Sequence, residues 1–323
     1  MRKTCFSNSH AAFTILEVLV ASAVFIMLLG LLMSTISQTS TVTRRATEKV
    51  SAFQGARSAF ELLTSKLSQA TMNSYWDYDS PTTPTKYIRK SELHFIVAPA
   101  GQNPLPGTSG TGQAVFFQAP GGVTGDATYS GMDNLLNAFG YYIDYKEESG
   151  LAFQTTAATT YRYRLMRSVV NTEYLEVYTD NSTLGSAWIS GNNSAVVAEN
   201  IVYMAIWPRK ATSEDSAGNA LTTTFAYNSR LNATSSPQPD TANQLPPTVQ
   251  VTLVAIDETS AQRFCTSSTA PTQISSAFSG LFTTSSVSQF ESDLETLAQQ
   301  LTANGVNFRV FTTIVPMRES KMQ

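Results

Sequence analysis

The sequence predicts an α+β protein, in which a long N-terminal helix packs on a mostly antiparallel β-sheet domain. Three observations support this fold class: an apolar run of membrane length, a proline-free stretch over residues 13–72, and alternating apolar and polar segments after it. The chain has 323 residues, enough for one large domain or two small ones. We expect two sheets on one continuous body rather than two domains.

The apolar run extends from Ala12 to Met33 and follows a short leader that carries Arg2 and Lys3. About 20 apolar residues cross a bilayer as a helix, so this run is long enough to span a membrane. Glu17 is its one ionisable residue. An ionisable side chain inside a membrane is expensive, which makes Glu17 a functional-site candidate.

We expect the helix over residues 13–72 to change character along its length. Its first half is apolar on all sides apart from Glu17, whereas its second half carries one apolar stripe at three- and four-residue spacing. A polar, β-branched segment at residues 39–47 lies between them and is the weakest part of the predicted helix. The stripe predicts packing on a folded domain. It consists of Val50, Phe53, Ala56, Phe60, Leu63 and Leu67.

Alternating segments after residues 80–84 predict half-buried strands, separated by polar and glycine-rich loops. A second helix is expected at residues 288–303, with Asn304-Gly305 as its stop signal. Its apolar face consists of Phe290, Leu294, Leu297 and Leu301. The expected strands are residues 92–97, 114–118, 141–145, 161–165, 175–179, 196–207, 249–256 and 308–315.

Composition and motifs argue against several classes of function. Charged residues make up 14% of the chain and its net charge is −3, whereas a nucleic-acid surface needs clustered Lys and Arg. The sequence has no phosphate-binding loop, nucleophile elbow, HExxH or CxxC motif, so we expect no enzyme, no cofactor and no metal centre. Once a leader with Cys5 and His10 is removed, Cys265 and His94 remain, and this pair makes no zinc site.

Three other features have an ordinary and a functional interpretation. His94 lies in an apolar segment and is expected to pack in the core. Tyr75, Trp76 and Tyr78 are expected to cap the long helix on the core rather than form a sugar-binding or partner surface. A group of loop carboxylates is expected to be a solvated patch, although calcium, which takes 6–8 oxygen ligands, stays an alternative. That group is Asp126, Asp133, Asp144, Glu147 and Glu148.

The junction at Ala12, a small residue followed by Phe-Thr-Ile-Leu-Glu and an apolar helix, resembles the N-terminus of type IV prepilins and pseudopilins. The resemblance implies that prepilin peptidase cuts between Ala12 and Phe13, that the Phe13 amine is methylated, and that Glu17 sets assembly and register. The family usually has Gly before the cut, where this chain has Ala12. There are two alternatives. A secretory signal peptide cut near Ala23 would leave an apolar stub on the mature chain. A plain single-pass anchor would give no reason for Glu17.

The resemblance extends into the soluble part. Nearly the whole chain is similar to the Verru_Chthon cassette protein C family, and more loosely to minor pseudopilin J and PilW-like proteins. The closer similarity is carried by residues 53–57, 67–71, 73–79, 91–95, 114–120, 134–138, 250–258 and 307–311. The looser one is carried by residues 161–166, 245–253 and 307–311.

This resemblance implies four parts: a leader at residues 1–12, a transmembrane or filament-core helix at 13–35, its amphipathic continuation at 36–79, and a β-rich pseudopilin-like domain at 80–323. It implies a minor pilin or pseudopilin of a type II secretion or type IV pilus-like machine, at low copy or at the tip. The expected location is the bacterial inner membrane, with the domain in the periplasm or in a filament. Expected partners are prepilin peptidase, other pseudopilin-like subunits and the membrane, with no nucleic acid. A membrane- or filament-displayed adhesin is the alternative.

Overall fold

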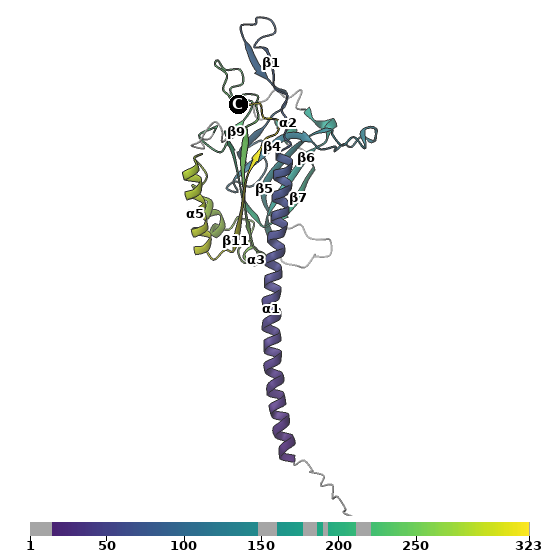
Figure 1. Cartoon of the computed structure of the whole chain (residues 1–323), viewed down its shortest axis with the longest axis vertical. Coiled ribbons are helices and arrows are strands. Elements are labelled where there is room, and N and C mark those ends of the chain that lie inside the picture. Colours follow the sequence, from purple (N-terminus) through teal and green to yellow (C-terminus); the bar gives the residue numbers. More distant parts are fainter. Residues whose placement is uncertain (1–14, 148–159, 177–185, 190–192, 211–220, 323) are drawn as a thin grey trace, which may run out of the picture. The chain divides into compact units, whose positions relative to one another are not determined.

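The computed structural model describes residues 15–147, 160–176, 186–189, 193–210 and 221–322, with only the backbone described at 41 and 44–52 (Figure 1). The chain divides into two compact units, Met1–Val50 and Ser51–Gln323. The second unit is one body with a six-stranded, a three-stranded and a two-stranded sheet. The expected α+β class is therefore confirmed, with all described strand pairs antiparallel.

The helix α1 (Ile15–Leu67) begins in the first unit and ends in the second. Its part Ile15–Ser40 contains an 18-residue window with a mean hydropathy of 2.7 and no buried residue, so it is long and apolar enough to cross a membrane. The helix ends earlier than expected, because the Thr71 amide leaves the helical pattern and donates a 2.8 Å hydrogen bond to the Gln118 carbonyl. Residues 68–79, expected as a continuation of the helix, instead contain a turn and a strand.

The apolar stripe on the second part of α1 packs as predicted from Phe53 to Leu67, and the side chain of Val50 lies outside the described part of the chain. Ala56, Leu63 and Leu67 are buried, as is Ala59, while Phe53 and Phe60 are half-buried against the core. The Phe60 ring lies 6.0 Å from the Phe311 ring of the three-stranded sheet. In the last turn of the helix, Lys66 Nζ donates to the Pro120 carbonyl at 2.9 Å and lies 4.9 Å from the Phe139 ring, both in the six-stranded sheet. This part of α1 therefore contacts both sheets.

The six-stranded sheet has the order β7-β6-β5-β4-β3-β9. Aromatic side chains dominate its packing, and Phe117 stacks on both Phe139 and Tyr141 from the neighbouring strand. Its strands are β3 (Ile96–Pro99), β4 (Gln113–Pro120), β5 (Leu136–Glu147), β6 (Tyr161–Val170), β7 (Asn193–Glu199) and β9 (Tyr227–Asn228).

The three-stranded sheet has the order β11-β10-β8 and comprises β8 (Ile201–Arg209), β10 (Thr248–Ile256) and β11 (Phe308–Pro316). Strand β8 also contacts β4, β5 and β6 of the six-stranded sheet. The close approach needs Gly112, because a Cβ there would lie 2.0 Å from the Met204 carbonyl oxygen. The Met204 amide donates to the Thr111 carbonyl at 3.0 Å. Strand β8 is thus the connection between the sheets.

The single strand expected over residues 196–207 is wrong, because Asn200 divides it into β7 and β8. Asn200 has a φ of 61°, a left-handed conformation that Asn tolerates better than most residues. Its amide donates to the Tyr163 carbonyl at 2.7 Å, and its Nδ2 donates to Glu258 Oε2 at 2.8 Å. Arg162 binds the same carboxylate through both terminal nitrogens, at 2.6 and 2.7 Å. These hydrogen bonds stabilise the turn at Asn200, where the chain passes from the six-stranded sheet into the three-stranded sheet.

The second helix is confirmed as α5 (Val287–Ala303), with Phe290, Leu297 and Leu301 buried and Leu294 half-buried. Gly305 follows its C-cap with a φ of 69°. His94 is a buried core residue as predicted, because its Nε2 lies 2.7 Å from Asn228 Oδ1 and its ring meets Trp188 edge-on.

The other strand predictions agree with the structure except at two places. Only the end of the segment 92–97 is a strand, since β3 begins at Ile96. Leu175 and Glu176 lie outside any strand, and residues 177–179 lie outside the described part of the chain. The remaining elements are β1 (Tyr75–Tyr78), β2 (Tyr87–Lys90), η1 (Ala127–Tyr129), η2 (Thr172–Tyr174), α2 (Ser186–Ile189), α3 (Glu258–Phe264), α4 (Thr272–Ser275) and η4 (Ser276–Phe278).

Leu62 and Leu63 provide a matched test of how α1 packs, because Leu63 is fully buried and Leu62 is 38% exposed. We expect Leu63→Ala to lower the free energy of unfolding of the second unit by about 2–5 kcal/mol, as for other buried leucines. Leu62→Ala should cost about 1 kcal/mol or less. Chemical denaturation followed by the fluorescence of the buried Trp188 and Trp207 measures both. Equal losses in the two variants would contradict the packing described.

Candidate functional site

The N-terminal site predicted from the sequence is described only in part. Ala12 and Phe13 lie outside the described residues, which begin at Ile15. Glu17 lies in the first turn of α1, where a negative charge interacts favourably with the helix dipole. Its side chain is exposed and is surrounded on the helix by exposed apolar residues such as Leu16 and Val18. The structure therefore places one carboxylate at the start of an apolar surface of membrane length.

The loop carboxylates do not form a site in the part of the chain that the structure describes. No group of three or more potential metal ligands is found among those residues. Asp126 caps η1 by accepting the Thr128 amide at 2.8 Å. The expectation that Asp144 belongs to a solvated patch is wrong: it is buried in β5, within the expected strand 141–145, with Lys146 Nζ at 2.5 Å and Thr108 Oγ1 at 3.1 Å. Asp133 and Glu147 are exposed, and Glu148 lies outside the described residues.

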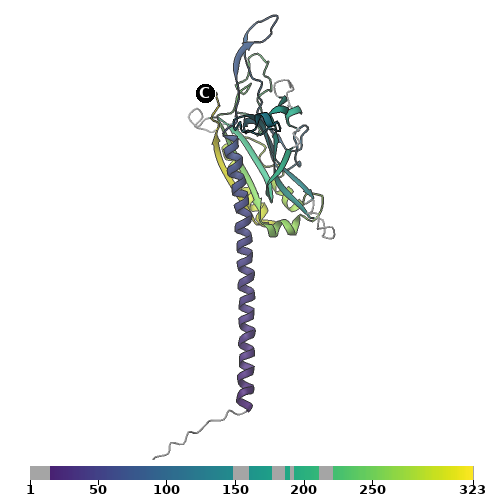
Figure 2. The ribbon, with the colours of Figure 1, turned by 90° about the vertical axis from the view of Figure 1, so that its right-hand side faces the viewer.

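The aromatic residues that follow the helix do not cap the core, so that expectation is also wrong. Tyr75, Trp76 and Tyr78 belong to β1 and are 42%, 65% and 45% exposed. Strand β1 pairs with β2 to form a two-stranded ribbon that extends away from the two larger sheets in both views (Figures 1 and 2). The chain leaves the core here because residues 75–78 pair with residues 87–90 instead of continuing the helix.

The turn of the ribbon is organised by one carboxylate. Asp79 accepts hydrogen bonds from the amides of Ser80, Thr85 and Lys86 at 3.0, 2.9 and 3.3 Å, and also from the Thr85 hydroxyl. These hydrogen bonds, led by the one from the Thr85 hydroxyl, hold the pKa of Asp79 well below its usual range. Asp79 therefore stays ionised and fixes the turn at ordinary pH.

The two faces of the ribbon differ in chemistry, since neighbouring residues along a strand point to opposite sides. The outer face carries three aromatic rings and a guanidinium. The Tyr78 and Tyr87 rings stack at 4.6 Å, and the Arg89 guanidinium lies 5.8 Å from the Trp76 ring. We call the opposite side, which carries Tyr75, Asp77, Ile88 and Lys90, the pocket face.

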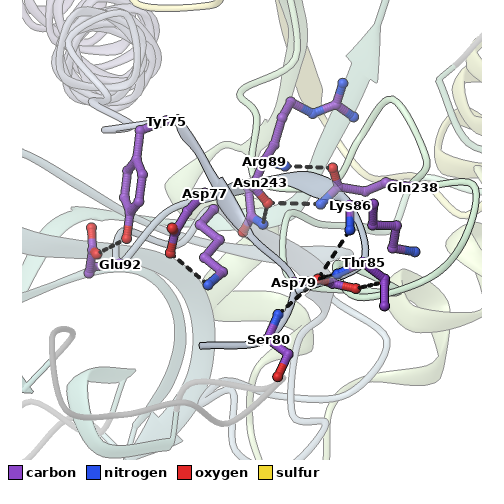
Figure 3. A network of polar contacts seen from close by, with 11 residues as sticks. Tyr75, Asp77, Asp79, Ser80, Thr85, Lys86, Arg89, Glu92, Gln238 and Asn243 are labelled. Atoms are coloured by element: carbon purple, nitrogen blue, oxygen red, sulfur yellow. Dashed lines mark hydrogen bonds and ion pairs between the residues drawn. The ribbon is translucent and has the colours of Figure 1, made fainter. Parts of the chain in front are cut away.

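Side chains from a distant loop hold β2 in place (Figure 3). Gln238 Oε1 accepts the Arg89 amide at 2.9 Å, and Gln238 Nε2 donates to the Arg89 carbonyl at 2.8 Å. Asn243 Nδ2 donates to the same carbonyl at 2.7 Å. A two-stranded ribbon alone is only marginally stable, and here amide side chains supply the hydrogen bonds of a third strand.

A pocket of about 600 Å³ lies between the pocket face and the loop at residues 230–235. Glu92 organises one wall: its carboxylate accepts from Tyr75 Oη at 2.5 Å and Asn73 Nδ2 at 2.6 Å, while its carbonyl accepts from Arg230 Nη2 at 2.5 Å. The hydrogen bond to Glu92 raises the pKa of Tyr75 to about 12. Burial raises the pKa of Glu92, but the hydrogen bonds from Tyr75 and Asn73 outweigh it, so this pKa lies below its usual range. At neutral pH Glu92 is therefore the ionised acceptor of this hydrogen bond and Tyr75 is its neutral donor.

Sequence reasoning missed this pocket, although part of its signal was present. The segment Tyr-Trp-Asp-Tyr at residues 75–78 and the segment Tyr-Ile-Arg-Lys at residues 87–90 flank a Pro-Thr-Thr-Pro turn, which is a hairpin pattern. No local sequence pattern predicts that Gln238, Asn243 and Arg230 contact the ribbon and its pocket, because they are ordinary polar residues in a long loop.

Gln238→Ala tests whether this loop holds the ribbon. The substitution removes two hydrogen bonds from the Arg89 peptide groups, each worth about 1 kcal/mol. We expect roughly tenfold faster amide exchange in a peptide covering residues 87–90, with an unchanged melting temperature of the second unit. Hydrogen–deuterium exchange mass spectrometry measures the exchange rate of this peptide. Gln299→Ala, at an exposed glutamine, is the control variant. Unchanged exchange in Gln238→Ala would show that other contacts hold the ribbon.

Comparisons with protein-family models, with curated proteins and with solved structures gave no match for this chain.

Proposed function

We propose that this chain is a prepilin-like minor pilin or pseudopilin, a structural subunit of a type II secretion or type IV pilus-like machine. The observation that carries the proposal is the exposed apolar helix Ile15–Ser40, with one carboxylate in its first turn. The same helix α1 continues without a break into the body, where its apolar stripe is buried. A helix with these two parts suits a subunit that is stored in a membrane and withdrawn into an assembly.

The proposed chemistry of assembly depends on the charge of Glu17. After cleavage before Phe13, the new N-terminal amine is positively charged near neutral pH. In a bundle of apolar helices, Glu17 has no water to solvate it, and pairing with the amine of a neighbouring Phe13 neutralises both charges. A misplaced subunit leaves a buried charge without its partner, which costs several kcal/mol. Glu17 thereby sets the register of each subunit. Pairing with the amine of its own chain is the alternative arrangement.

The proposal includes the location and partners of the protein. The apolar helix anchors the chain in the bacterial inner membrane, with the β-rich body in the periplasm or in a pilus-like filament. Prepilin peptidase and other pseudopilin-like subunits are its partners. The size of the body, Ser51–Gln323, favours a low-copy or tip position over a repeating filament subunit.

A second candidate function, a membrane- or filament-displayed adhesin, is favoured by one observation. The ribbon presents four exposed aromatic side chains beside an open pocket, and exposed aromatic clusters mark interaction surfaces. The two functions are compatible, because a tip subunit of a filament can also bind a ligand.

Processing gives the first test. We expect the mature N-terminus to be a methylated Phe13, and we expect Ala12→Gly to be cut at least as well, since the related family usually has Gly there. Mass spectrometry of the native protein reads both the cleavage site and the methyl group. A mature protein that begins at Ala23, or that retains Met1, would contradict the prepilin assignment.

Assembly gives the second test. We expect Glu17→Ala and Glu17→Gln to insert into the membrane and lose their leader normally, since neither step needs a buried ion pair. Recovery of partner subunits should fall in both variants, whereas Glu17→Asp, which keeps the charge with a shorter reach, should be partly defective. Crosslinking and co-purification from membranes measure this recovery. Equal recovery from the wild type and all three variants would mean that Glu17 does not set assembly and that the helix is a plain anchor.

A further inference from the structure

We infer that the pocket between the β1–β2 ribbon and the loop at residues 230–235 binds a neutral oligosaccharide. This inference is independent of the proposed role in assembly, because every residue it uses lies in the second unit, Ser51–Gln323. It rests on the size of the pocket, on the way its charges are paired, and on the exposed ring of Tyr75.

The pocket has the size of a small-molecule site. Its volume of about 600 Å³ lies within the 300–1,000 Å³ range of ligand sites. Its walls are held before any ligand arrives: Gln238 fixes β2, Lys86 Nζ donates to the Ser235 carbonyl at 3.4 Å, and Arg230 bonds the Glu92 carbonyl. A site with fixed walls needs little ordering on binding, which favours affinity.

The charged groups of the pocket argue for a neutral ligand. Lys90 pairs with Asp77 at 2.8 Å. Arg89 donates to the carbonyls of Pro239 and Ala242 at 2.5 and 3.3 Å. Glu92 accepts from two donors, and Asp79 is used by its own turn. With Arg230, which donates to the Glu92 carbonyl at 2.5 Å, the cations Arg89, Lys90 and Arg230 are matched by the anions Asp77, Asp79 and Glu92. A charged ligand therefore meets no excess of opposite charge, whereas hydroxyl groups can donate to and accept from the oxygens and nitrogens already in place.

The apolar part of the pocket suits one face of a sugar ring. A pyranose has an apolar face of C–H groups and a rim of hydroxyls. Tyr75 is 42% exposed and its hydroxyl donates to Glu92 (Figure 3), so its ring is held in one orientation. The same residue lines the cavity. Leu231 is 53% exposed on the opposite wall. The exposed Asn232 and Thr234 add an amide and a hydroxyl for the rim of the sugar.

The outer face of the ribbon provides a control for substitutions in the pocket. It carries Trp76, Tyr78 and Tyr87, which are as exposed as Tyr75 or more so, but none of them lines the pocket. Tyr78→Ala therefore removes a stacked aromatic residue from the same short strand without changing the pocket. Any loss of binding that comes from loosening the ribbon appears in this variant as well.

The test is calorimetric titration of the full chain in a zwitterionic, non-glycosidic detergent, because sugar-based detergents compete for the site. The probes are a panel of neutral hexasaccharides with α- and β-linked glucose, mannose and N-acetylglucosamine, and hexagalacturonate as the ionic comparison. We expect at least one neutral hexasaccharide to bind, with an affinity that is unchanged by added salt. Tyr75→Ala should weaken it by about three- to tenfold, the value of one aromatic contact. Tyr75→Phe keeps the ring but loses the hydrogen bond to Glu92 that orients it, so it should weaken binding less than Tyr75→Ala does. Tyr78→Ala should bind as the wild type does.

Three results would overturn the inference. The first is no binding by any neutral hexasaccharide. The second is binding of hexagalacturonate alone with strong salt dependence, which would identify an ionic site. The third is equal weakening by Tyr75→Ala and Tyr78→Ala, which would mean that the loss comes from loosening of the ribbon and that the Tyr75 ring makes no contact with the ligand. None of these results bears on the cleavage before Phe13, so the proposed function is tested separately.

Discussion

The burial of one face of α1 is the interaction on which the rest of the second unit depends. Ala56, Ala59, Leu63 and Leu67 place small and large apolar side chains on one side of the helix, where they are removed from water. The same helix contacts Phe311 in the three-stranded sheet, and Phe139 in the six-stranded sheet. Within the second unit, a helix that contacts both sheets fixes their mutual position.

Polar groups shape the connection between the two sheets, whose buried apolar residues belong to one hydrophobic cluster. Asn200 turns the chain from β7 into β8 in a left-handed conformation, and its side chain joins the Glu258–Arg162 ion pair. Gly112 lets the β8 backbone come close enough for a hydrogen bond at Met204.

The two candidate sites use a carboxylate in opposite ways. Glu17 lies on an exposed apolar surface, where an ionised group is tolerated in a membrane or a bundle only with a partner, so it is suited to choosing that partner. Glu92 is already bonded to Tyr75 and Asn73, so it is suited to holding a surface in a fixed shape. The Glu92 carboxylate thus has its hydrogen bonds in place before a ligand arrives, whereas the proposed role of Glu17 depends on a partner that it meets during assembly.

The sequence by itself determined the elements whose signal is local. Neighbouring residues are enough to predict the apolar run, the stripe on α1, the apolar face and stop signal of α5, and most strands. Glu17 is likewise recognisable from the sequence, as the one carboxylate in the apolar run. Tertiary structure alone decided the break at Asn200, the burial of Asp144, and the ribbon pocket. Arg89 and Gln238, which hold that ribbon, are 149 positions apart. Their hydrogen bonds depend on loops brought together by the packed core, and no local pattern encodes that meeting.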